Sequence, residues 1–258
     1  MAEIITSRKN PVIKEASQLR TDAAVRRSSG LYIIEGARIV NDAAVSGVGI
    51  SQLFYTGKAL KKYGVYLKKA QEISEKSYEI DEHIVSLLSD TKSSQEIFAV
   101  CRTGDNILSG RLEGRTVVLE NIQDPSNMGN ILRTAEALGI KTITLCGDCC
   151  DVISPKVLRG SMGAVFRLNF ISADSAKSLT SRLSGYKIYS SVPDASAEKI
   201  YDISFDDNSA VVIGNEGNGI TEEMKSVSDA LVTIPMGGRA ESLNAATAAA
   251  ILIWEMTK

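Results

Sequence analysis

The sequence is poor in cysteine, histidine and aromatic residues, and each shortage argues against a class of protein. Its 258 residues include 4 cysteines, one histidine and 5% aromatic residues. The cysteines do not form the spaced framework of a small secreted disulfide domain, because three of them crowd residues 146–150. With His83 as the single histidine, a Ser-His-Asp triad is disfavoured, and we expect this residue on the surface at the start of a helix.

The segment that begins at Cys146 contains the C-x-x-C spacing of some zinc and redox sites. A structural zinc ion needs about four ligands, and only Cys101 and His83 remain outside this segment. A redox pair is expected near a helix N-terminus in a thioredoxin-like unit. We therefore predict a loop of small residues after a strand, and no bound metal.

Long hydrophobic runs are also absent. No stretch approaches the roughly 20 apolar residues that a membrane-spanning helix requires. The first residues, MAEIITSRKNPVIK, lack the apolar centre of a signal peptide. Hydrophobic residues make up 44% of the chain and charged residues 23%, which is typical of a globular protein with one or two cores. We expect a cytoplasmic protein without a membrane partner.

Charge is distributed unevenly along a chain whose net charge is only −2. Residues 1–104 carry 15 Lys and Arg against 12 Asp and Glu, a balance of +3. Residues 105–258 carry 14 against 19, a balance of −5. A basic N-terminal part on an acidic body is typical of a partner-docking domain beside a second domain. A solvated surface with no special function would show the same charges.

The first part of the chain reads as a small α/β domain over residues 1–104. Pro11 after Asn10 suits the start of a helix. Gly47 suits a helix end. The pattern predicts helices at residues 11–19, 37–45, 60–74 and 84–88, and strands at residues 31–34, 53–55 and 97–100. A polar, glycine-rich stretch without periodicity follows, and we predict a linker at residues 105–115.

From residue 116 onward, short apolar runs rich in β-branched residues alternate with helical segments. We predict strands at residues 117–119, 142–145, 165–170, 187–192, 210–213 and 231–234, and a final helix at residues 243–256. Such alternation indicates a mostly parallel sheet covered on both faces, in a second domain over residues 116–258. Ligands of these sheets bind beyond the carboxyl ends of the strands.

Three polar segments follow predicted strands. The first runs from Asn121 to Gly139 and contains Asn127 and Arg133. Asn127 can cap a helix that carries Arg133 one to two turns later, which would place a cation near free backbone N–H groups and suit an anion. A capped helix with a surface arginine would give the same pattern.

The second and third segments are rich in glycine. Residues 212–220, VIGNEGNGI, place three glycines around Glu216, and residues 234–246, IPMGGRAESLNAA, join a strand to the last helix. Glycines permit close approach of a backbone to a ligand, and also simple tight turns. Ser242 in the third segment could be an ordinary N-cap. The chain has no G-x-G-x-x-G fingerprint of dinucleotide-binding proteins.

The three segments, in this order and spacing, closely resemble the signature motifs of the SpoU (TrmH-like) class of SPOUT methyltransferases. Residues 154–163, SPKVLRGSMG, resemble the family's intervening segment. Residues 6–47 resemble the RNA-binding domain that precedes the catalytic domain in many members, so the resemblance covers nearly the whole chain. The third motif usually continues Asn-Val-Ser-Val, whereas this chain has Asn-Ala-Ala-Thr from Asn244. Family roles beyond Asn244 are therefore not carried over.

The resemblance implies an RNA ribose 2′-O-methyltransferase that uses S-adenosylmethionine. It also implies a deep trefoil knot in the C-terminal sheet domain, which pattern reasoning would have excluded. The family acts as a homodimer, with the first-motif arginine near the partner's cofactor. The matching cofactor residues are Gly214, Gly219, Ile234, Met236 and Leu243.

The matching catalytic residues are Asn127, Arg133, Glu216, Ser242 and Asn244. We expect Arg133 to grip a phosphate and stabilise the forming alkoxide, because a guanidinium is a poor base. Glu216 is expected to order the cofactor loop. For the N-terminal domain, the candidate RNA contacts are Arg8, Lys9, Arg26, Arg27 and Arg38.

Ribosomal RNA is the preferred substrate, with transfer RNA as the alternative. A base or protein methyltransferase and a non-catalytic RNA-binding paralogue are two further readings. The intact set of motif residues argues against the non-catalytic one.

Overall fold

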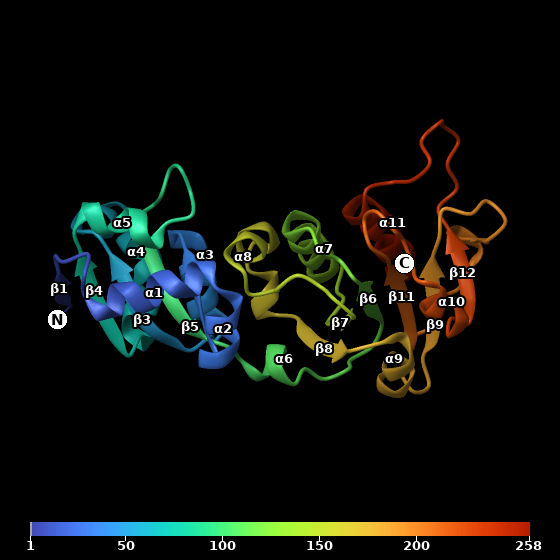
Figure 1. The fold of residues 1–258 in the computed structure, drawn as a ribbon, viewed down its shortest axis with the longest axis horizontal. Coiled ribbons are helices and arrows are strands. Elements are labelled where there is room, and N and C mark those ends of the chain that lie inside the picture. Colours follow the sequence, from blue (N-terminus) through green and yellow to red (C-terminus); the bar gives the residue numbers. More distant parts are fainter. Residues whose placement is uncertain (1) are drawn as a thin grey trace. The chain divides into compact units, whose positions relative to one another are not determined.

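The computed structural model describes residues 2–258 and divides the chain into two compact units (Figure 1). The first unit holds the residues up to Gly104 together with Ile153–Phe166, and the second holds Asp105–Val152 with Arg167–Lys258. The chain therefore passes between the units three times. No helix in the described part is both long and apolar enough to cross a membrane.

The first unit is built on a five-stranded mixed sheet. Its strands are β1 (Glu3–Ile5), β2 (Leu31–Glu35), β3 (Ile50–Tyr55), β4 (Lys76–Ile80) and β5 (Ile97–Arg102), in the order β1-β4-β3-β5-β2. Strands β1 and β3 each pair with β4 in parallel, whereas β5 runs antiparallel to β2 and β3. The sequence did not indicate the two strands at the β1 edge, β1 and β4.

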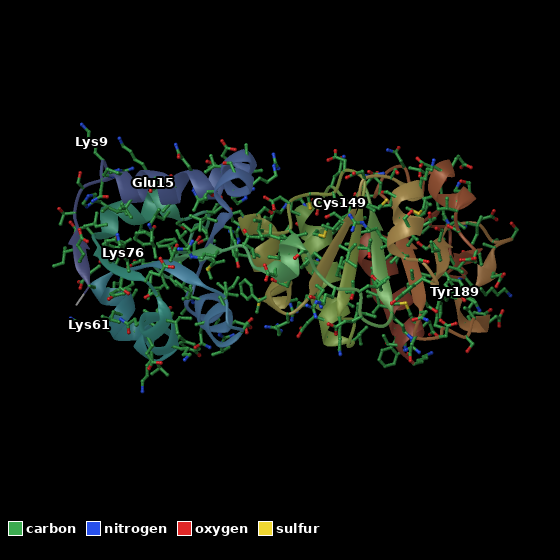
Figure 2. All side chains as sticks on the ribbon, turned by 90° about the horizontal axis from the view of Figure 1, so that it is seen from below. Lys9, Glu15, Lys61, Lys76, Cys149 and Tyr189 are labelled. Carbon is green, nitrogen blue, oxygen red and sulfur yellow. The ribbon has the colours of Figure 1, made fainter. Side chains whose placement is uncertain are left out.

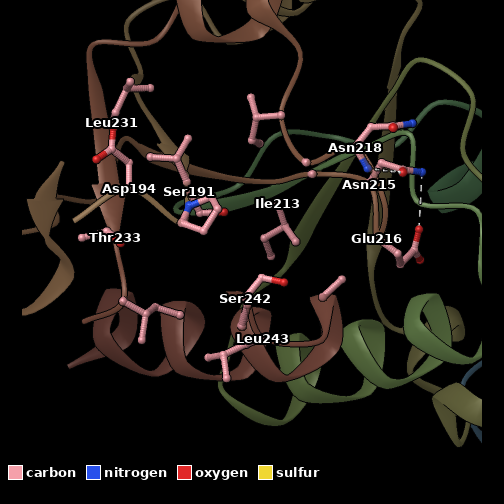
Figure 3. Close-up of a pocket in the computed structure, with 18 of the residues that line it drawn as sticks. Ser191, Asp194, Ile213, Asn215, Glu216, Asn218, Leu231, Thr233, Ser242 and Leu243 are labelled. Atoms are coloured by element: carbon pink, nitrogen blue, oxygen red, sulfur yellow. Dashed lines mark hydrogen bonds between the residues drawn. The ribbon is translucent and has the colours of Figure 1, made fainter. Parts of the chain in front are cut away.

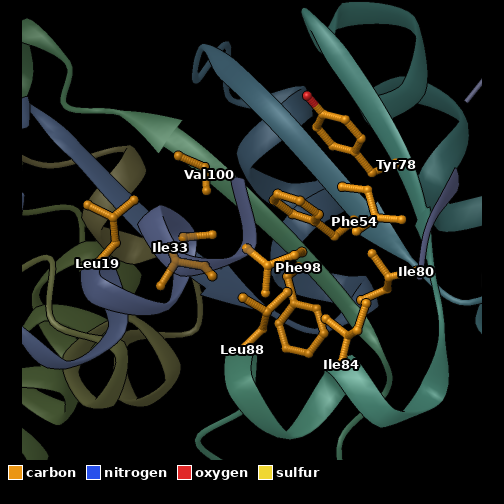
Figure 4. Close-up of a cluster of buried hydrophobic side chains, with 12 residues drawn as sticks. Leu19, Ile33, Phe54, Tyr78, Ile80, Ile84, Leu88, Phe98 and Val100 are labelled. Carbon is orange, nitrogen blue, oxygen red and sulfur yellow. The ribbon is translucent and has the colours of Figure 1, made fainter. Parts of the chain in front are cut away.

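Helices cover both faces of this sheet. They are α1 (Pro11–Thr21), α2 (Ala23–Ser29), α3 (Ala37–Val45), α4 (Gly57–Ile73) and α5 (Glu82–Leu88). Strand side chains alternate between the faces, and those of Phe54 and Phe98 join α1 and α5 in one apolar cluster (Figure 4). Helices α3 and α4 pack together on the other face. Figure 2 shows Glu15 of α1 and Lys61 of α4 on opposite sides of the unit.

A short excursion from the second half of the chain covers the edge strand β2. It consists of α8 (Pro155–Ser161) and the 3-10 helix η1 (Ala164–Phe166), and α8 packs on β2. An edge strand exposes unpaired backbone groups, and a covering helix is one way to shield them. This segment belongs to the compact first unit, although in the sequence it falls between β7 and β8, two strands of the second sheet.

The second unit contains a seven-stranded sheet in which every pairing is parallel. The strands are β6 (Thr116–Glu120), β7 (Thr142–Cys146), β8 (Asn169–Ala173), β9 (Lys187–Ser191), β10 (Glu198–Lys199), β11 (Ser209–Ile213) and β12 (Ala230–Thr233), ordered β10-β12-β9-β11-β6-β7-β8. All residues of β6 and β11 are buried, as expected for inner strands of a parallel sheet. The predicted α/β class is confirmed.

The strand predicted at residues 165–170 was wrong in its first half. Residues 164–166 form the 3-10 helix η1, and β8 begins only at Asn169. Met162 and Gly163 before it both have positive φ angles, 51° and 84°, which end α8 and turn the chain. The buried side chains of Val165 and Phe166 therefore belong to a helical turn. A short run of apolar residues is expected for a buried helical turn as well as for a buried strand, so the sequence pattern could not tell them apart.

The helices of the second unit are α6 (Asp105–Leu108), α7 (Pro125–Ala137), α9 (Ala176–Arg182), α10 (Glu222–Ser226), α11 (Ala245–Thr257) and the 3-10 helix η2 (Ile200–Asp202). Helix α11 packs on α7 and β11. The stretch predicted as a linker packs on this unit. Gly110 donates a hydrogen bond to the Phe170 carbonyl at 3.1 Å, and a side chain at Gly110 would collide with the Phe170 backbone. A close backbone approach thus explains this glycine.

Candidate functional site

A pocket of about 450 Å³ lies where β9, β11 and β12 end. The carboxyl edge of a parallel sheet is the expected place for a ligand. Three loops line the pocket. They contribute Ser191–Asp194 after β9, residues 214–220 after β11, and Ile234, Met236, Ser242 and Leu243 after β12. Figure 3 shows Asp194, Leu231 and Thr233 at one end and Asn215, Glu216 and Asn218 at the other.

The loop after β11 is closed upon itself. Asn215 and Gly219 exchange backbone hydrogen bonds of 3.1 and 2.9 Å, and the Asn215 side chain accepts from the backbone of Gly217 and Asn218. A side chain at Gly214 would collide with the Gly219 backbone, and Gly219 itself has φ +68°. The loop's own geometry therefore requires Gly214 and Gly219.

Glu216 ties this loop to the first motif. Its Oε1 accepts hydrogen bonds from Asn127 Nδ2 at 3.0 Å and Asp124 N at 3.2 Å, and its Oε2 accepts from Gln123 N at 3.5 Å. Burial would raise the pKa of Glu216, but the bonds from Asn127 and from backbone N–H groups outweigh burial and lower it. The carboxylate is ionised at neutral pH and its acceptors are occupied, as expected for a residue that orders a loop.

Asn127 passes the connection on to the third motif. Its Oδ1 accepts from Asn244 Nδ2 at 3.0 Å, while Asn244 Oδ1 accepts from the N–H groups of Ala246 and Thr247 at the start of α11. Each amide thus uses its nitrogen toward one neighbour and its oxygen toward the other, which fixes both orientations. The three signature segments meet in one chain of hydrogen bonds from Glu216 through Asn127 to Asn244.

The structure corrects two predicted helix caps. Helix α7 is capped by Asp124, whose side chain accepts from Ser126 N and Asn127 N, so Asn127 lies inside the first turn. Helix α11 is capped by Asn244, and Ser242 lines the pocket two residues before it. Both true caps are equally good capping types, and Pro125 at the first helical position was the missed signal for the first.

Arg133 stands apart from the pocket of its own chain. It lies on α7 with an exposed side chain and does not line the pocket. Among residues 2–258 no hydrogen bond or ion pair within 4.0 Å holds its guanidinium. The predicted catalytic set is therefore only partly assembled within one chain. The network residues meet and Ser242 lines the pocket, whereas Arg133 does not line it.

All five predicted cofactor residues line the pocket, namely Gly214, Gly219, Ile234, Met236 and Leu243. The contribution of Ser191 and Asp194, at and just after the end of β9, was not predicted from the sequence. Hydrogen bonds from the backbone and side chain of Ser196 lower the pKa of Asp194. Glu120 was also not predicted. Its buried carboxylate accepts hydrogen bonds from the hydroxyl (2.5 Å) and the N–H (3.0 Å) of Thr221, and these bonds anchor the end of the loop after β11. Ser191 ends β9 and Asp194 follows it closely, and this position at a strand end was the available signal for these two residues.

The candidate RNA contacts fare differently. Lys9, Arg27 and Arg38 are exposed, and Arg8 is exposed with one bond to the His83 carbonyl at 3.1 Å. Arg26 is only 4% exposed and donates to the Leu19 carbonyl at 2.8 Å, at the end of α1. The prediction of Arg26 as a phosphate contact is therefore corrected, because its guanidinium supports a helix terminus.

The cysteine segment forms the loop that was expected after a strand. All four cysteines are free, and Cys149 donates to the Leu119 carbonyl at 3.2 Å. Burial raises the pKa of Cys146 and of Cys150 to about 12 in each case. Thiols in this state are poor nucleophiles. Within residues 2–258 no group of three or more His, Cys, Asp or Glu side chains could hold a metal ion.

Comparison with known proteins gives two family matches. Residues 114–254 match the SpoU rRNA Methylase family, and residues 10–99 match the MRM3-like substrate binding domain. The chain is 30% identical to an uncharacterised tRNA/rRNA methyltransferase of Synechocystis, over 97% of this chain and 92% of the relative. It is 27% identical to the 23S rRNA (guanosine(2553)-2′-O)-methyltransferase RlmP of Bacillus subtilis, over 98% of each chain.

Solved structures agree over almost the full length. The AdoMet-bound rRNA methyltransferase of Sinorhizobium meliloti superposes with a TM-score of 0.87 at 27% identity, covering 99% of this chain and 97% of that one. The SpoU methyltransferase AviRb of Streptomyces viridochromogenes, in complex with AdoMet, gives a TM-score of 0.85 at 25% identity, covering 96% and 97%. Two proteins of the same fold are thus known with this cofactor bound.

Proposed function

The chain belongs to the SpoU rRNA methylase family, and on this basis we propose that it transfers a methyl group from S-adenosylmethionine to a ribose 2′-hydroxyl of ribosomal RNA. The observation that carries the proposal is the bonded chain from Glu216 through Asn127 to Asn244 beside the pocket. It joins the three signature segments in a fold shared over the full chain with AdoMet-bound methyltransferases.

The pocket fits S-adenosylmethionine in size and chemistry. Its volume of about 450 Å³ falls in the range of pockets for small ligands. Ile234, Met236 and Leu243 offer an apolar slot for the adenine, and the backbone of Gly214 and Gly219 offers polar groups without side-chain bulk. When bound, the cofactor supplies a methyl group on a sulfonium, which is open to in-line attack by an oxygen.

The residues of this chain position the reactants and stabilise charge. A ribose hydroxyl is a poor nucleophile until its proton is leaving, so the site must favour the alkoxide. Glu216 does not act as the base, because its oxygens already accept four hydrogen bonds. The guanidinium of Arg133 binds the neighbouring phosphate and stabilises the forming oxyanion. Water accepts the proton.

We infer that the enzyme is a homodimer in which Arg133 acts at the partner's pocket. Arg133 is exposed and lies outside the pocket of its own chain. Helix α11, which packs on the Arg133 helix α7, leaves Trp254 55% exposed. Thr247 and Ile251 share its helix face. A large aromatic exposed on an otherwise apolar helix suits a subunit interface.

We also infer the trefoil knot. Strand β12 lies beyond β9, yet the chain then returns as α11 to pack on β11 and α7. The returning segment, residues 234–244, borders the same pocket as the closed loop after β11. A segment that doubles back beside a closed loop is the arrangement that threading would produce.

Ribosomal RNA is preferred over transfer RNA because the named relatives with full-length coverage act on 23S rRNA. The test uses purified protein, tritiated S-adenosylmethionine and unmodified 23S rRNA transcript. We expect label in the RNA and a new block to alkaline cleavage at one step, because a 2′-O-methyl group removes the attacking hydroxyl. Label on a base, or label only in transfer RNA, would overturn the proposal. No label together with no cofactor binding would identify a non-catalytic RNA-binding protein.

A further inference from the structure

The exposed side of α4 carries an unusual concentration of positive charge. Its 17 residues include five lysines and one acidic residue, Glu72. The lysines are Lys58, Lys61, Lys62, Lys68 and Lys69, and all five are exposed. Together with Val65 they form what we call the lysine face. The sequence pattern predicted a helix at residues 60–74, but none of its residues was among the predicted RNA contacts.

The helix geometry gathers these lysines on one side. At 100° per residue, the five lysines fall within about 120° of one another around the helix axis. Val65, 90% exposed, lies at the centre of this arc, and the buried residues Ala59, Leu67 and Ala70 lie on the other side. From Lys58 to Lys69 the face is about 16 Å long at 1.5 Å per residue.

Most of this charge has no counterpart within the protein. Lys58 lies 3.8 Å from Glu96, and Lys69 lies 3.8 Å from Glu72. For Lys61, Lys62 and Lys68, no ion pair within 4.0 Å is present among residues 2–258.

The spacing of the lysines also costs helix stability. Lys58 has like charges three and four residues later, at Lys61 and Lys62, and like charges at these spacings destabilise a helix. The lysine face therefore does not serve the fold, and it is complementary to a ligand that carries many negative charges.

Val65 lies among the charges, and two tyrosines lie beside them on the same helix. Val65 is almost fully exposed and Tyr66 is 39% exposed, while Lys62 lies 5.1 Å from the centre of the Tyr63 ring. Nucleic-acid surfaces commonly combine cations for the phosphates with apolar and aromatic groups for sugars and bases. A surface that only maintained solubility would have no need of the exposed valine and tyrosine.

We propose that the lysine face of α4 binds the sugar-phosphate backbone of the substrate RNA. This inference rests on the proposed function and names the surface that it would use. Helix α4 shares its layer with α3, which carries the exposed Arg38, and lies on the opposite side of the sheet from Glu15 on α1 (Figure 2). The docking layer is thus α3 with α4, on the face away from α1.

The test compares two variants that remove the same charge from the same unit. The first is the triple variant Lys61→Gln, Lys62→Gln, Lys68→Gln. The control is Lys14→Gln, Lys76→Gln, Lys92→Gln, whose three lysines are also exposed and lie on α1, β4 and the loop before β5. Affinity for unmodified 23S rRNA transcript is measured from low to high salt. Cofactor affinity and thermal unfolding are measured in parallel.

We expect the first variant to bind RNA at least about tenfold more weakly at moderate salt. The slope of log binding constant against log salt concentration should become less negative by roughly two to three. The control should lose clearly less of both, with folding and cofactor affinity unchanged in both variants. Equal losses of RNA affinity in the two variants would overturn the proposal that the lysine face binds RNA, while methylation by the wild-type protein would still support the proposed function. Wild-type protein that binds anionic lipid vesicles but no RNA would overturn both.

Discussion

Gly214 is the residue for which the structure leaves least freedom. A Cβ atom there would collide with backbone atoms of Gly219 and Ile220, which cannot move without opening the loop. We expect Gly214→Ala to weaken cofactor binding by at least about tenfold and to destabilise the protein by about 1–3 kcal/mol. Isothermal titration with S-adenosylmethionine and thermal unfolding measure the two effects.

Gly217→Ala is the matched control for the fold, since the nearest atom to an added Cβ, Asn215 Oδ1, is 3.6 Å away. We expect its unfolding temperature to stay close to that of wild type. Equal unfolding temperatures for Gly214→Ala and wild type would contradict the steric argument.

Glu216 is expected to set cofactor affinity through the loop that it orders. A glutamine at this position keeps one acceptor oxygen for Asn127 and Asp124, but presents an amide donor toward the N–H of Gln123. We expect Glu216→Gln to raise the KM for S-adenosylmethionine by about tenfold, the order of one lost charged hydrogen bond. The pH–rate profile should keep its limbs, because Glu216 is not the base. Loss of one limb in the variant would assign base chemistry to Glu216.

The lowered pKa of Glu216 fixes the sign of a stability effect. A group whose pKa is lower in the folded state stabilises the protein above its unfolded pKa, and this contribution is lost as pH falls through the folded value. The difference in unfolding temperature between wild type and Glu216→Gln should therefore be largest near neutral pH. It should shrink below about pH 4.3, the ordinary range of a glutamate.

Arg26 separates a structural role from an RNA-binding role. Its buried guanidinium donates to the Leu19 carbonyl, whereas its neighbour Arg27 is exposed. Arg26→Ala should cost about 2–3 kcal/mol of unfolding free energy, because it removes a charged hydrogen bond and leaves a buried carbonyl unpaired. Arg27→Ala should cost less than about 0.5 kcal/mol. Denaturant titration compares the two, and equal costs would argue against the capping role.

Residue types could be predicted from the sequence more readily than residue environments. The resemblance of the motifs identified the five cofactor residues that line the pocket, whereas their residue types alone also suited simple turns and helix caps. Arginine at position 26 looked the same as arginine at position 27, since nothing in the sequence shows which side of a short helix meets the carbonyls of another. Glu120 was missed because an acidic residue that ends a buried strand carries no mark of its Thr221 partner.

At the scale of elements, Asp90 holds the covering helix α8 to the first unit. Its carboxylate lies 2.7 Å from Arg159 of α8 and 3.5 Å from Arg20 of α1. Arg20 Nε and Arg159 Nη1 are buried atoms without a hydrogen-bond partner, so the two guanidinium groups depend on this one acid. Loss of the Asp90 charge would leave both cations without their shared partner.

We expect Asp90→Asn to cost about 1–2 kcal/mol, less than a fully buried pair because these side chains are 24–42% exposed. The control is Glu75→Gln, which breaks an ion pair of 2.8 Å to Arg102 with both side chains 57% exposed. It should cost less than about 0.5 kcal/mol. Chemical denaturation measures both, and a control that costs as much as Asp90→Asn would remove the special role of Asp90.

Elements with strong periodicity or good caps could be predicted, and short ones could not. The helix at residues 37–45 was predicted with both ends correct, since Gly47 closes it. Strand β1 was missed because it has only three residues and its partner β4 is distant in sequence, and β4 was missed because charged and polar residues dominate it. The excursion at residues 153–166 was invisible for a different reason. Which unit a helix packs against depends on tertiary contacts rather than on its own pattern.

At the scale of the whole molecule, no local pattern predicts that a chain passes three times between its units. The sequence supported two domains and the α/β class, because hydrophobic rhythm and turn residues are local signals. A knot and a shared active site are global properties, and they entered only through the resemblance. The separation of Arg133 from its own pocket is the structural observation that makes the shared site testable.

Mixed dimers test it directly. Arg133→Ala removes the guanidinium and leaves the pocket intact, whereas Asn244→Ala breaks the hydrogen-bond network and leaves Arg133 in place. Each homodimer is expected to be inactive. If Arg133 acts at the partner's pocket, every mixed dimer contains one site with both functions. Random exchange of equal amounts should then restore about one quarter of wild-type activity, since half of the dimers are mixed and one site in each works.

If Arg133 acted within its own chain, each site of a mixed dimer would carry one defect and activity would stay near zero. Differently tagged subunits, co-expressed and purified through both tags, isolate the mixed dimer and should raise the restored activity to about half of wild type. Trp254→Glu in both chains places a charge on the exposed face of α11. We expect this change to yield monomers in light scattering and to abolish the restored activity, because a monomer cannot supply Arg133 to a second pocket.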